Sequence, residues 1–288
     1  MSGDQTLSSS TRLAAVIGHP IGHSLSPVLH NAAFRALGID WAYLAFDVDE
    51  PAVPRALDAM RVLGIDGLSV TMPDKEAVAR HVDRLEPDAE ALAAVNCVSR
   101  EGDVLIGHNT DGQGFIDSLR LDQGFEPEGR TCGVIGAGGA ARAVIRSLAG
   151  VGAAEVAVVN RSPERGEQAA RLAGTRGRLA TAAELEGVEL VVNATPAGMG
   201  GSAELPLDPE VLQPGQLVID LVYHPLETPL VVAARERGAR AANGVGMLVH
   251  QAGHQLRIWT GLEPPLAALR AAVTEAVSES EASESPEY

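Results

Sequence analysis

Lys75 is the only lysine among the 22 basic residues of this 288-residue chain, and the other 21 are arginines. A guanidinium group keeps its proton near neutral pH, whereas the pKa of an ammonium group changes readily with burial and with neighbouring charges. Lys75 follows Ser69-Val-Thr-Met-Pro-Asp, where a short apolar strand leads through a proline turn into a helix. This setting predicts a lysine that transfers a proton. A chance survivor on a solvated helix face is the alternative interpretation.

Two hydroxyl groups precede a predicted helix near the start of the chain. Ser24 and Ser26 flank Leu25 just before Pro27. The N–H groups at a helix start favour an anion, so the two serines are candidates to bind one. An ordinary N-cap is the competing interpretation.

Further polar side chains stand at the ends of predicted strands. Thr71 ends one strand, Asn96 begins another, and Asp111 follows a third. Open α/β sheets bind their ligands at strand ends. A carboxylate near Lys75 would keep the ammonium charged and oriented, which makes Lys75 and Asp111 a candidate proton-transfer pair. Asp111 would equally serve as the cap of the next helix.

A glycine-rich loop in the middle of the chain joins an apolar strand to a helix. Glycines in this context let the backbone turn tightly and approach a pyrophosphate, and the helix start supplies free N–H groups. The loop therefore predicts a dinucleotide site made by Gly136, Ala137, Gly138, Gly139 and Ala140.

The segment after the next strand indicates which dinucleotide binds. It reads Asn160-Arg161-Ser162-Pro-Glu-Arg165 and has no carboxylate at its first positions. An acidic residue there suits the ribose hydroxyls of NAD, whereas arginine suits a 2′-phosphate. We expect Arg161 and Arg165 to lie one helical turn apart and to hold that phosphate from two sides, which favours NADP. Ordinary surface arginines are the alternative.

The overall composition limits the partners and the compartment. A net charge of −16 argues against nucleic acid or an anionic membrane as partner. Cys97 and Cys132 lie in apolar segments, which indicates buried thiols in a reducing compartment, and the eight histidines are scattered, so no metal site is predicted. No leader and no membrane-spanning apolar run is evident, so we expect a cytoplasmic protein. Separately, we expect a monomer or a homodimer.

Strands and helices alternate along the chain, which predicts an α/β fold with mostly parallel sheets in two domains. The last two helices, near 247–259 and 264–277, are expected to return to the first domain. The predicted substrate domain is 12–111 with 247–277, the dinucleotide domain is 112–246, and the polar ends 1–11 and 278–288 are expected to be disordered.

Taken together and in order, these segments resemble the shikimate dehydrogenase family over about residues 13–272. The resemblance rests on Gly18 to Pro27, Ser69 to Lys75, Ala94 to Asn96, Asn109 to Gly112, the glycine loop, Asn160 to Ser162, Asn193 to Thr195 and Gly244 to Gln251.

This resemblance implies an oxidoreductase that reduces 3-dehydroshikimate to shikimate with NADPH, on the route to chorismate and the aromatic amino acids. Lys75 and Asp111 would form the catalytic pair. The resemblance also assigns the remaining roles: Ser24, Ser26 and Tyr223 at the substrate carboxylate, Thr71, Asn96 and Gln251 at its other oxygens, the glycine loop with Asn160, Arg161, Ser162 and Arg165 at NADP, and Thr195, Gly246 and Met247 near the nicotinamide.

Three positions depart from the common family pattern. Many members have Asn where Ser69 stands, Asp74 replaces an apolar residue or histidine, and His108 stands where several members have Asp. Asp74, in a first helical turn, would complement the helix dipole. Quinate or dual quinate/shikimate dehydrogenases, aminoshikimate relatives and a non-catalytic NADP or shikimate sensor remain as alternatives. Arg161 argues against the first, since those enzymes usually prefer NAD, and the intact catalytic pair argues against the last.

Overall fold

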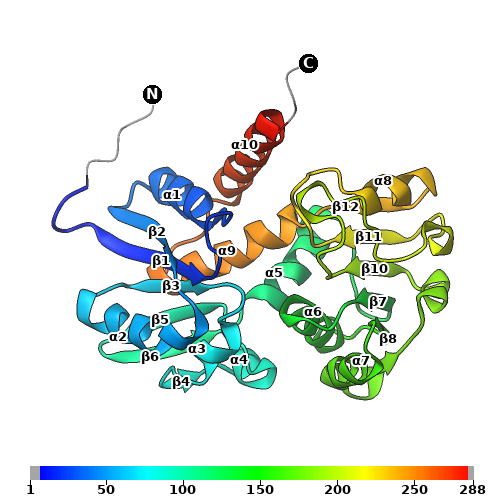
Figure 1. Cartoon of the computed structure of the whole chain (residues 1–288), viewed down its shortest axis with the longest axis horizontal. Coiled ribbons are helices and arrows are strands. Elements are labelled where there is room, and N and C mark those ends of the chain that lie inside the picture. Colours follow the sequence, from blue (N-terminus) through cyan, green and yellow to red (C-terminus); the bar gives the residue numbers. More distant parts are fainter. Residues whose placement is uncertain (1–6, 285–288) are drawn as a thin grey trace. The chain divides into compact units, whose positions relative to one another are not determined.

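The computed structural model describes residues 7–284 and divides into two compact units (Figure 1). Of the described residues, the first unit takes 7–110 and 251–276, and the second takes 111–250 and 277–284. The predicted α/β fold is confirmed, with two sheets, and the stretch from Gln251 to Ala276 belongs to the first unit.

The first unit is built on a six-stranded sheet of order β2-β1-β3-β5-β6-β4. Its strands are parallel except for β5, which runs antiparallel to both β3 and β6. A tight turn at Gly102, where φ is +63°, joins β5 to β6 as a hairpin. The bounds are β1 Arg12–Gly18, β2 Trp41–Asp47, β3 Gly67–Val70, β4 Arg84–Leu85, β5 Cys97–Glu101, β6 Val104–His108, α1 Ser26–Leu37, η1 Glu50–Ala52, α2 Val53–Leu63, α3 Lys75–Ala79 and α4 Pro87–Leu92.

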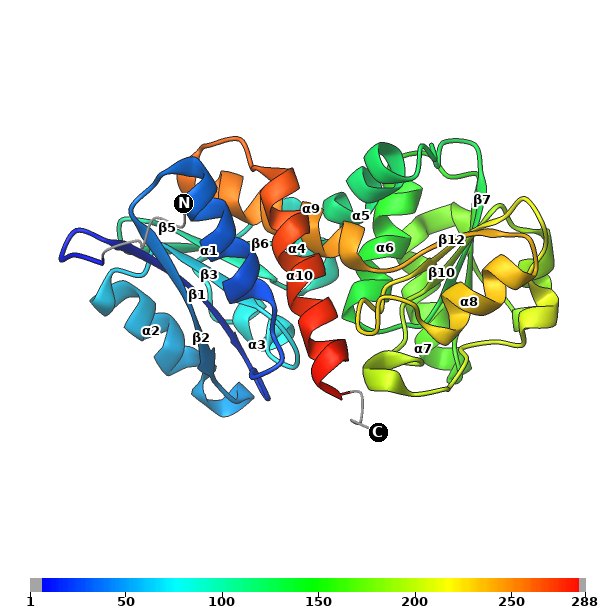
Figure 2. The ribbon, with the colours of Figure 1, turned by 90° about the horizontal axis from the view of Figure 1, so that it is seen from above.

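Successive side chains along the strands of this unit point to opposite faces of the sheet, and helices pack on each face. Ala15, Ile17, Leu68 and Val70 pack in one buried cluster with residues of α2, α3 and α4. On the other face, a Cβ on Gly67 would lie 2.4 Å from the Trp259 ring of α9 (Val245–Thr260), so only glycine lets that helix lie against the sheet. Figure 2 shows α1 and α2 on opposite sides of this sheet.

The second unit holds a fully parallel sheet of order β12-β11-β10-β7-β8-β9. Read from the other edge, its strands follow the order 3-2-1-4-5-6 of the dinucleotide-binding fold, with the order reversing between β7 and β10. The bounds are α5 Asp111–Asp117, η2 Ser118–Asp122, β7 Thr131–Ile135, α6 Gly139–Gly150, β8 Glu155–Val159, α7 Pro163–Ala170, η3 Arg171–Arg176, β9 Gly177–Leu179, η4 Ala182–Gly187, β10 Leu190–Asn193, η5 Met199–Gly201, η6 Pro209–Val211, β11 Leu217–Asp220, α8 Pro229–Glu236 and β12 Arg240–Ala242.

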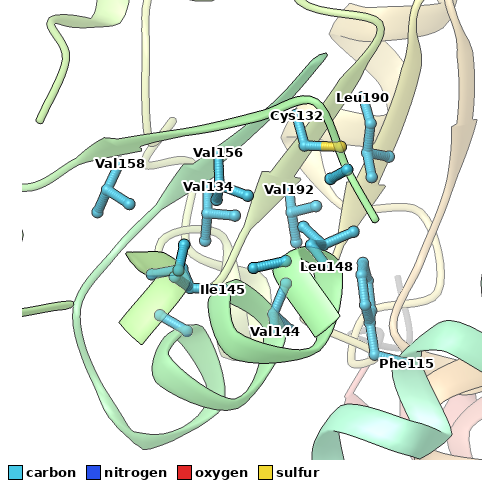
Figure 3. Close-up of a cluster of buried hydrophobic side chains, with 14 of the residues drawn as sticks. Phe115, Cys132, Val134, Val144, Ile145, Leu148, Val156, Val158, Leu190 and Val192 are labelled. Carbon is cyan, nitrogen blue, oxygen red and sulfur yellow. The ribbon is translucent and has the colours of Figure 1, made fainter. Parts of the chain in front are cut away.

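Helix α6 covers one face of this sheet. Its residues Val144, Ile145 and Leu148 are fully buried and lie in one cluster with Val134 of β7 and Val192 of β10 (Figure 3). Cys132 lies in the same cluster, and both cysteines of the chain are free and buried, as predicted. The packing fixes the start of α6 at the carboxyl edge of β7.

Both predicted disordered ends contain ordered residues. Residues 7–11 form a turn in which the Thr11 hydroxyl donates to Asp40 at 2.7 Å. Helix α10 (Leu266–Glu284) continues through 278–284, where we expected disorder; Glu281 accepts a hydrogen bond from the Leu226 N–H at 2.7 Å. Alanine and glutamate are good helix formers, so a low-complexity composition did not prevent the helix. The remaining residues of the predicted tails, 1–6 and 285–288, lie outside the described part of the chain.

Candidate active site

Two loops of the first unit are joined by backbone hydrogen bonds at the carboxyl ends of β1 and β3. The Thr71 N–H donates to the Ile17 carbonyl at 2.9 Å, and the His19 N–H donates to the Met72 carbonyl at 3.1 Å. These neighbouring strands are followed by helices on opposite sheet faces, which is where open α/β sheets form a ligand crevice. The loop that carries Ser24 therefore begins beside the loop that leads to Lys75.

Ser24 and Ser26 lie at the start of α1, and both are half-buried. Leu25 occupies the N-cap position, and no side chain caps the helix there. Instead the Ser24 hydroxyl accepts a hydrogen bond from the Ser26 N–H at 3.3 Å. The N-cap interpretation is therefore wrong in detail, and both hydroxyls lie beside the amino end of α1, where an anion is favoured.

Lys75 is the first residue of α3 and is half-buried. Its carbonyl accepts a hydrogen bond from the Val95 N–H at 2.9 Å, and the Asn96 carbonyl accepts one from the Val70 N–H at 2.9 Å. The backbone thus brings Lys75 and Asn96 together at the end of β3, although they are far apart in sequence.

Asn96 is buried and binds both the next loop and helix α9. Its Oδ1 accepts from the Thr110 N–H at 2.8 Å, and its Nδ2 donates to Thr110 Oγ1 at 3.0 Å. Thr110 Oγ1 also donates to the Gln251 carbonyl at 3.2 Å, and Gln255 Nε2 donates to the Asn96 carbonyl at 3.2 Å. Sequence reasoning gave Asn96 a ligand role only and missed Thr110 and Gln255. The Asn-Thr-Asp segment was the signal available for Thr110, whereas Gln255 had none.

The first unit therefore gathers six predicted site residues: Ser24, Ser26, Thr71, Lys75, Asn96 and Gln251. Asp111 and Tyr223 belong to the second unit. Asp111 is buried as the first residue of α5, and Tyr223 is half-buried, with a pKa raised by burial. The pairing of Lys75 with Asp111 stays a prediction.

Two of the three departures have local structural explanations. His108 Nε2 lies 2.8 Å from the Ser99 hydroxyl across the β5–β6 hairpin, and burial lowers the pKa of His108. Ser69 is buried between the Tyr43 hydroxyl, at 2.6 Å, and Gln255 Oε1, at 2.5 Å. His108 therefore has a packing role within the sheet, and Ser69 is part of a buried chain of hydrogen bonds.

Asp74 is the third departure and is fully buried. Neither carboxyl oxygen has a hydrogen-bond partner among the described residues, and the side chain makes no cap bond to α3. Burial raises the pKa of Asp74, and the nearby acidic groups Glu50 and Asp49 raise it further. Asp74 therefore lies at the amino end of α3 as a buried carboxyl group without a hydrogen bond among the described residues, and its interaction with the helix dipole stays a prediction.

In the second unit, the glycine loop lies at the point where the strand order reverses. Gly136 has φ of +120°, and its N–H donates to the Val159 carbonyl at 2.8 Å. A Cβ at this position would lie 3.0 Å from the Ala194 carbonyl oxygen, so a side chain is disfavoured both by the positive φ and by a tight backbone contact. Gly138 is the N-cap of α6 and provides no side chain to cap it, and a Cβ on Gly138 or Gly139 would meet nothing within 4 Å.

The segment after β8 lies beside this loop, because the Gly136 N–H donates a hydrogen bond to the carbonyl of Val159, the last residue of β8. Asn160 Nδ2 donates to the Ser162 carbonyl at 2.8 Å, and the Ser162 hydroxyl caps α7 by accepting the Arg165 N–H at 3.4 Å. Arg161 is exposed and precedes the helix, while Arg165 is exposed in its first turn. The expected helical spacing of the two arginines is therefore wrong, because the helix begins only after Ser162.

Thr195 lies on the other side of Gly136. Its Cγ2 is 3.3 Å from the position of a Cβ on Gly136, and its hydroxyl donates to Asn193 Oδ1 at 2.7 Å. Asn193 Nδ2 in turn donates to the buried Asp220 at 2.8 Å, and Asp220 also accepts from the Thr228 hydroxyl at 2.6 Å. Sequence reasoning missed this buried network, which fixes the loop after β10.

Gly246 and Met247 lie at the start of α9. A Cβ on Gly246 would be 2.1 Å from the Ser118 hydroxyl, so this glycine permits close packing on η2, and Met247 packs against the core under the sheet. Within the second unit, the contacts of both residues are explained by packing. Their place near a nicotinamide stays a prediction.

The residues of the second unit fit a dinucleotide phosphate. The start of α6 has no side-chain cap, the loop leaves open space above Gly138 and Gly139, and two exposed arginines lie in the adjacent segment. No group of three or more His, Cys, Asp or Glu in the described part of the chain is arranged to hold a metal ion. Fold and site together define a two-domain α/β protein of the dinucleotide-dependent oxidoreductase class.

Comparison with known proteins gives the particular family. Residues 16–98 match the shikimate dehydrogenase substrate binding domain, 122–198 match shikimate / quinate 5-dehydrogenase, and 244–274 match the shikimate 5'-dehydrogenase C-terminal domain. The chain is 45% identical over 282 residues to shikimate dehydrogenase (NADP(+)) of Geobacter metallireducens, covering 94% of this chain and 99% of that one. It belongs to the shikimate dehydrogenase family, as the sequence motifs predicted.

Solved structures agree with this assignment. Shikimate 5-dehydrogenase from Thermus thermophilus, in complex with NADP(H) and shikimate, is 36% identical with a TM-score of 0.87, and the match covers 92% of this chain and 99% of that one. Quinate dehydrogenase from Corynebacterium glutamicum, in complex with NAD, is 30% identical with a TM-score of 0.85, covering 92% and 99% of the two chains. Among the described residues, no helix is both long and apolar enough to span a membrane.

Asp74→Asn should raise the stability of the protein near neutral pH. Because the pKa of Asp74 is raised in the folded protein, ionisation of the buried carboxyl destabilises the fold as the pH rises from the ordinary aspartate range through the folded-state pKa. Asparagine removes this charge, so thermal unfolding of the variant should occur at higher temperature near pH 7, and the difference should vanish toward about pH 4.

The exposed Asp103→Asn serves as the matched control and should leave the melting temperature unchanged. A lower melting temperature for Asp74→Asn near pH 7 would show that the ionised carboxyl is stabilised by its surroundings.

Proposed function

We propose that this chain catalyses the reversible, NADP-dependent reduction of 3-dehydroshikimate to shikimate. The observation that carries the proposal is the near full-length similarity to NADP-dependent shikimate dehydrogenases, combined with a glycine loop whose neighbouring segment presents arginines and no carboxylate. As part of the same proposal, the enzyme works in the cytoplasm, as a monomer or homodimer, on the route to chorismate and the aromatic amino acids.

The first unit would bind the substrate through its polar groups. The carboxylate of shikimate would meet the Ser24 and Ser26 hydroxyls beside the start of α1, together with Tyr223. Thr71, Asn96 and Gln251 would meet the remaining oxygens. A preformed arrangement of this kind orients the reacting carbon at little entropic cost on binding, because Asn96 is already held by Thr110.

Lys75 would provide the proton chemistry. Negative charge develops on the carbonyl oxygen during reduction, and an adjacent ammonium both stabilises this charge and donates a proton. In the oxidation direction Lys75, with Asp111, would remove the proton from the alcohol. NADP, held by the glycine loop, Asn160, Arg161, Ser162 and Arg165, and with Thr195, Gly246 and Met247 toward its nicotinamide, supplies or accepts the hydride.

A steady-state assay with four substrate and cofactor combinations tests the proposed function. We expect kcat/KM to be highest for shikimate with NADP and lower for quinate with either cofactor. The value for shikimate with NADP should be at least about tenfold above that for shikimate with NAD, since one charge-assisted bond to a 2′-phosphate contributes about 1.5–3 kcal/mol. Preference for quinate with NAD would assign the chain to the quinate branch of the family. Absence of turnover with all four pairs would favour a binding protein.

Replacement of Lys75 should remove most of the catalysis and leave the fold intact. Lys75→Ala and Lys75→Arg should each lower kcat by roughly 10²- to 10⁴-fold, which is the usual contribution of a general acid. Circular dichroism and thermal melting control for unfolding. Lys75→Arg is the decisive variant, because it keeps the positive charge on a guanidinium group that does not release its proton near neutral pH. Near-normal turnover with arginine at this position would exclude Lys75 as the proton donor.

Arg161→Ala tests the choice of cofactor. Loss of a charge-assisted hydrogen bond should raise the KM for NADP by roughly 10- to 100-fold and leave the KM for NAD nearly unchanged. Arg171→Ala, which removes another exposed arginine just after α7, is the matched control and should affect neither cofactor. Equal losses for NADP and NAD in Arg161→Ala would show that this arginine does not contact the 2′-phosphate.

A further inference from the structure

A chain of buried hydrogen bonds runs through the first unit from strand β2 to helix α9. The Tyr43 hydroxyl lies 2.6 Å from Ser69 Oγ, and Ser69 Oγ lies 2.5 Å from Gln255 Oε1. These three side chains are 1%, 4% and 3% exposed. Buried polar groups are costly unless they are paired, so such a chain fixes the orientation of every member.

The donor and acceptor roles along this chain follow from one fixed group. The Asn96 backbone carbonyl can only accept, so the Gln255 atom that faces it at 3.2 Å must be the amide nitrogen. Gln255 Oε1 therefore faces Ser69, Ser69 must donate its proton to it, and Tyr43 must donate to Ser69. The amide orientation of Gln255 is thus determined by chemistry.

Gln255 also holds the side chain of Gln251, which lies one helical turn earlier in α9. Its second N–H donates to Gln251 Oε1 at 2.9 Å. The Gln251 carbonyl is held as well, by the Thr110 hydroxyl at 3.2 Å. The bond from Gln255 fixes which end of the Gln251 amide faces Gln255: it is the carbonyl oxygen and not the NH₂ group. Gln255 itself is 3% exposed, donates both of its N–H groups inside the protein and accepts from Ser69 there, so it acts on a ligand only through its neighbours.

We infer that Gln255 is a positioning residue for substrate binding, which holds the Gln251 amide in one orientation, with its carbonyl oxygen toward Gln255. The inference rests on the proposed function, in which Gln251 contacts shikimate. It adds a specificity element, because an amide held in one orientation presents its donor and acceptor groups to the ligand in a fixed arrangement.

Gln255→Leu tests this role, since it keeps the side-chain volume and removes both the donor to Gln251 and the acceptor for Ser69. The Gln251 amide is then released to rotate, so we expect the KM for shikimate to rise roughly five- to tenfold, while the KM for NADP stays within about twofold. If Gln255→Leu does not fold, the double variant Ser69→Ala/Gln255→Leu removes the unpaired hydroxyl and should show the same rise.

Gln216→Leu is the matched control for removing a buried glutamine. Gln216 is 4% exposed and donates to the Leu185 and Val188 carbonyls at 2.9 and 2.8 Å, in the second unit. It should lower the melting temperature and leave the KM for shikimate unchanged. An equal rise of that KM in Gln216→Leu and Gln255→Leu would show general loosening and overturn the inference.

A double-mutant cycle with Gln251→Ala separates the inference from the proposed function. If Gln255 acts through Gln251, Gln255→Leu should add less than about twofold to the shikimate KM of Gln251→Ala. A full additional penalty, or an unchanged KM in Gln255→Leu beside a raised one in Gln251→Ala, would overturn the positioning role alone. An unchanged KM in Gln251→Ala would instead remove the substrate role of Gln251, and the inference with it.

Discussion

The hydrogen bonds of Asn96 are the interaction on which the substrate side of this protein depends. Its side chain holds Thr110 through two bonds, and its carbonyl accepts from both Val70 and Gln255. One buried amide thus connects the end of β3, the loop after β6 and helix α9. The end of β3 leads to Thr71 and Lys75, and α9 carries Gln251, so the mutual positions of these proposed ligand contacts are set before any substrate binds. The cost of burying a side-chain amide is offset because the protein satisfies it.

The dinucleotide side depends on a different constraint, the close approach of backbones at Gly136. A side chain there would meet the Ala194 carbonyl, and the glycine N–H is bonded to the end of β8. Three loops therefore meet at the point where the strand order reverses. Arg161 lies in the second of these loops and Thr195 in the third. The proposed phosphate contacts are therefore brought to one place by the order of the parallel strands.

Much of the fold and part of the site were predictable from the sequence, because local signals determine them. Alternating apolar segments with proline and glycine boundaries predicted the strands and helices, and the glycine loop predicted the turn between β7 and α6 where the strand order reverses. Interactions between distant residues were not predictable. Ser69 and Gln255 are 186 residues apart, and nothing near either residue indicates the other. The same holds for the burial of Asp74, which its sequence neighbours do not indicate.

The position of Arg161 shows why local spacing was insufficient there. Its separation from Arg165 fits one helical turn, but Ser162 ends the extended segment and caps the helix that follows. Conversely, the low-complexity end of the chain is helical as far as Glu284, because its composition also suits a helix. In both places several conformations were compatible with the sequence, and capping or tertiary contacts selected one.

The measurement that tests the central claim most directly is the acylation of the single lysine. An amine-directed reagent has two targets, Lys75 and the amino terminus of the chain, and peptide mass analysis counts the label on each separately. We expect activity to fall in proportion to the label on the Lys75 peptide and to be independent of label at the amino terminus. Shikimate should slow both the labelling of Lys75 and the loss of activity, and NADP alone should slow them less. Full activity after quantitative acylation of Lys75 would contradict the account.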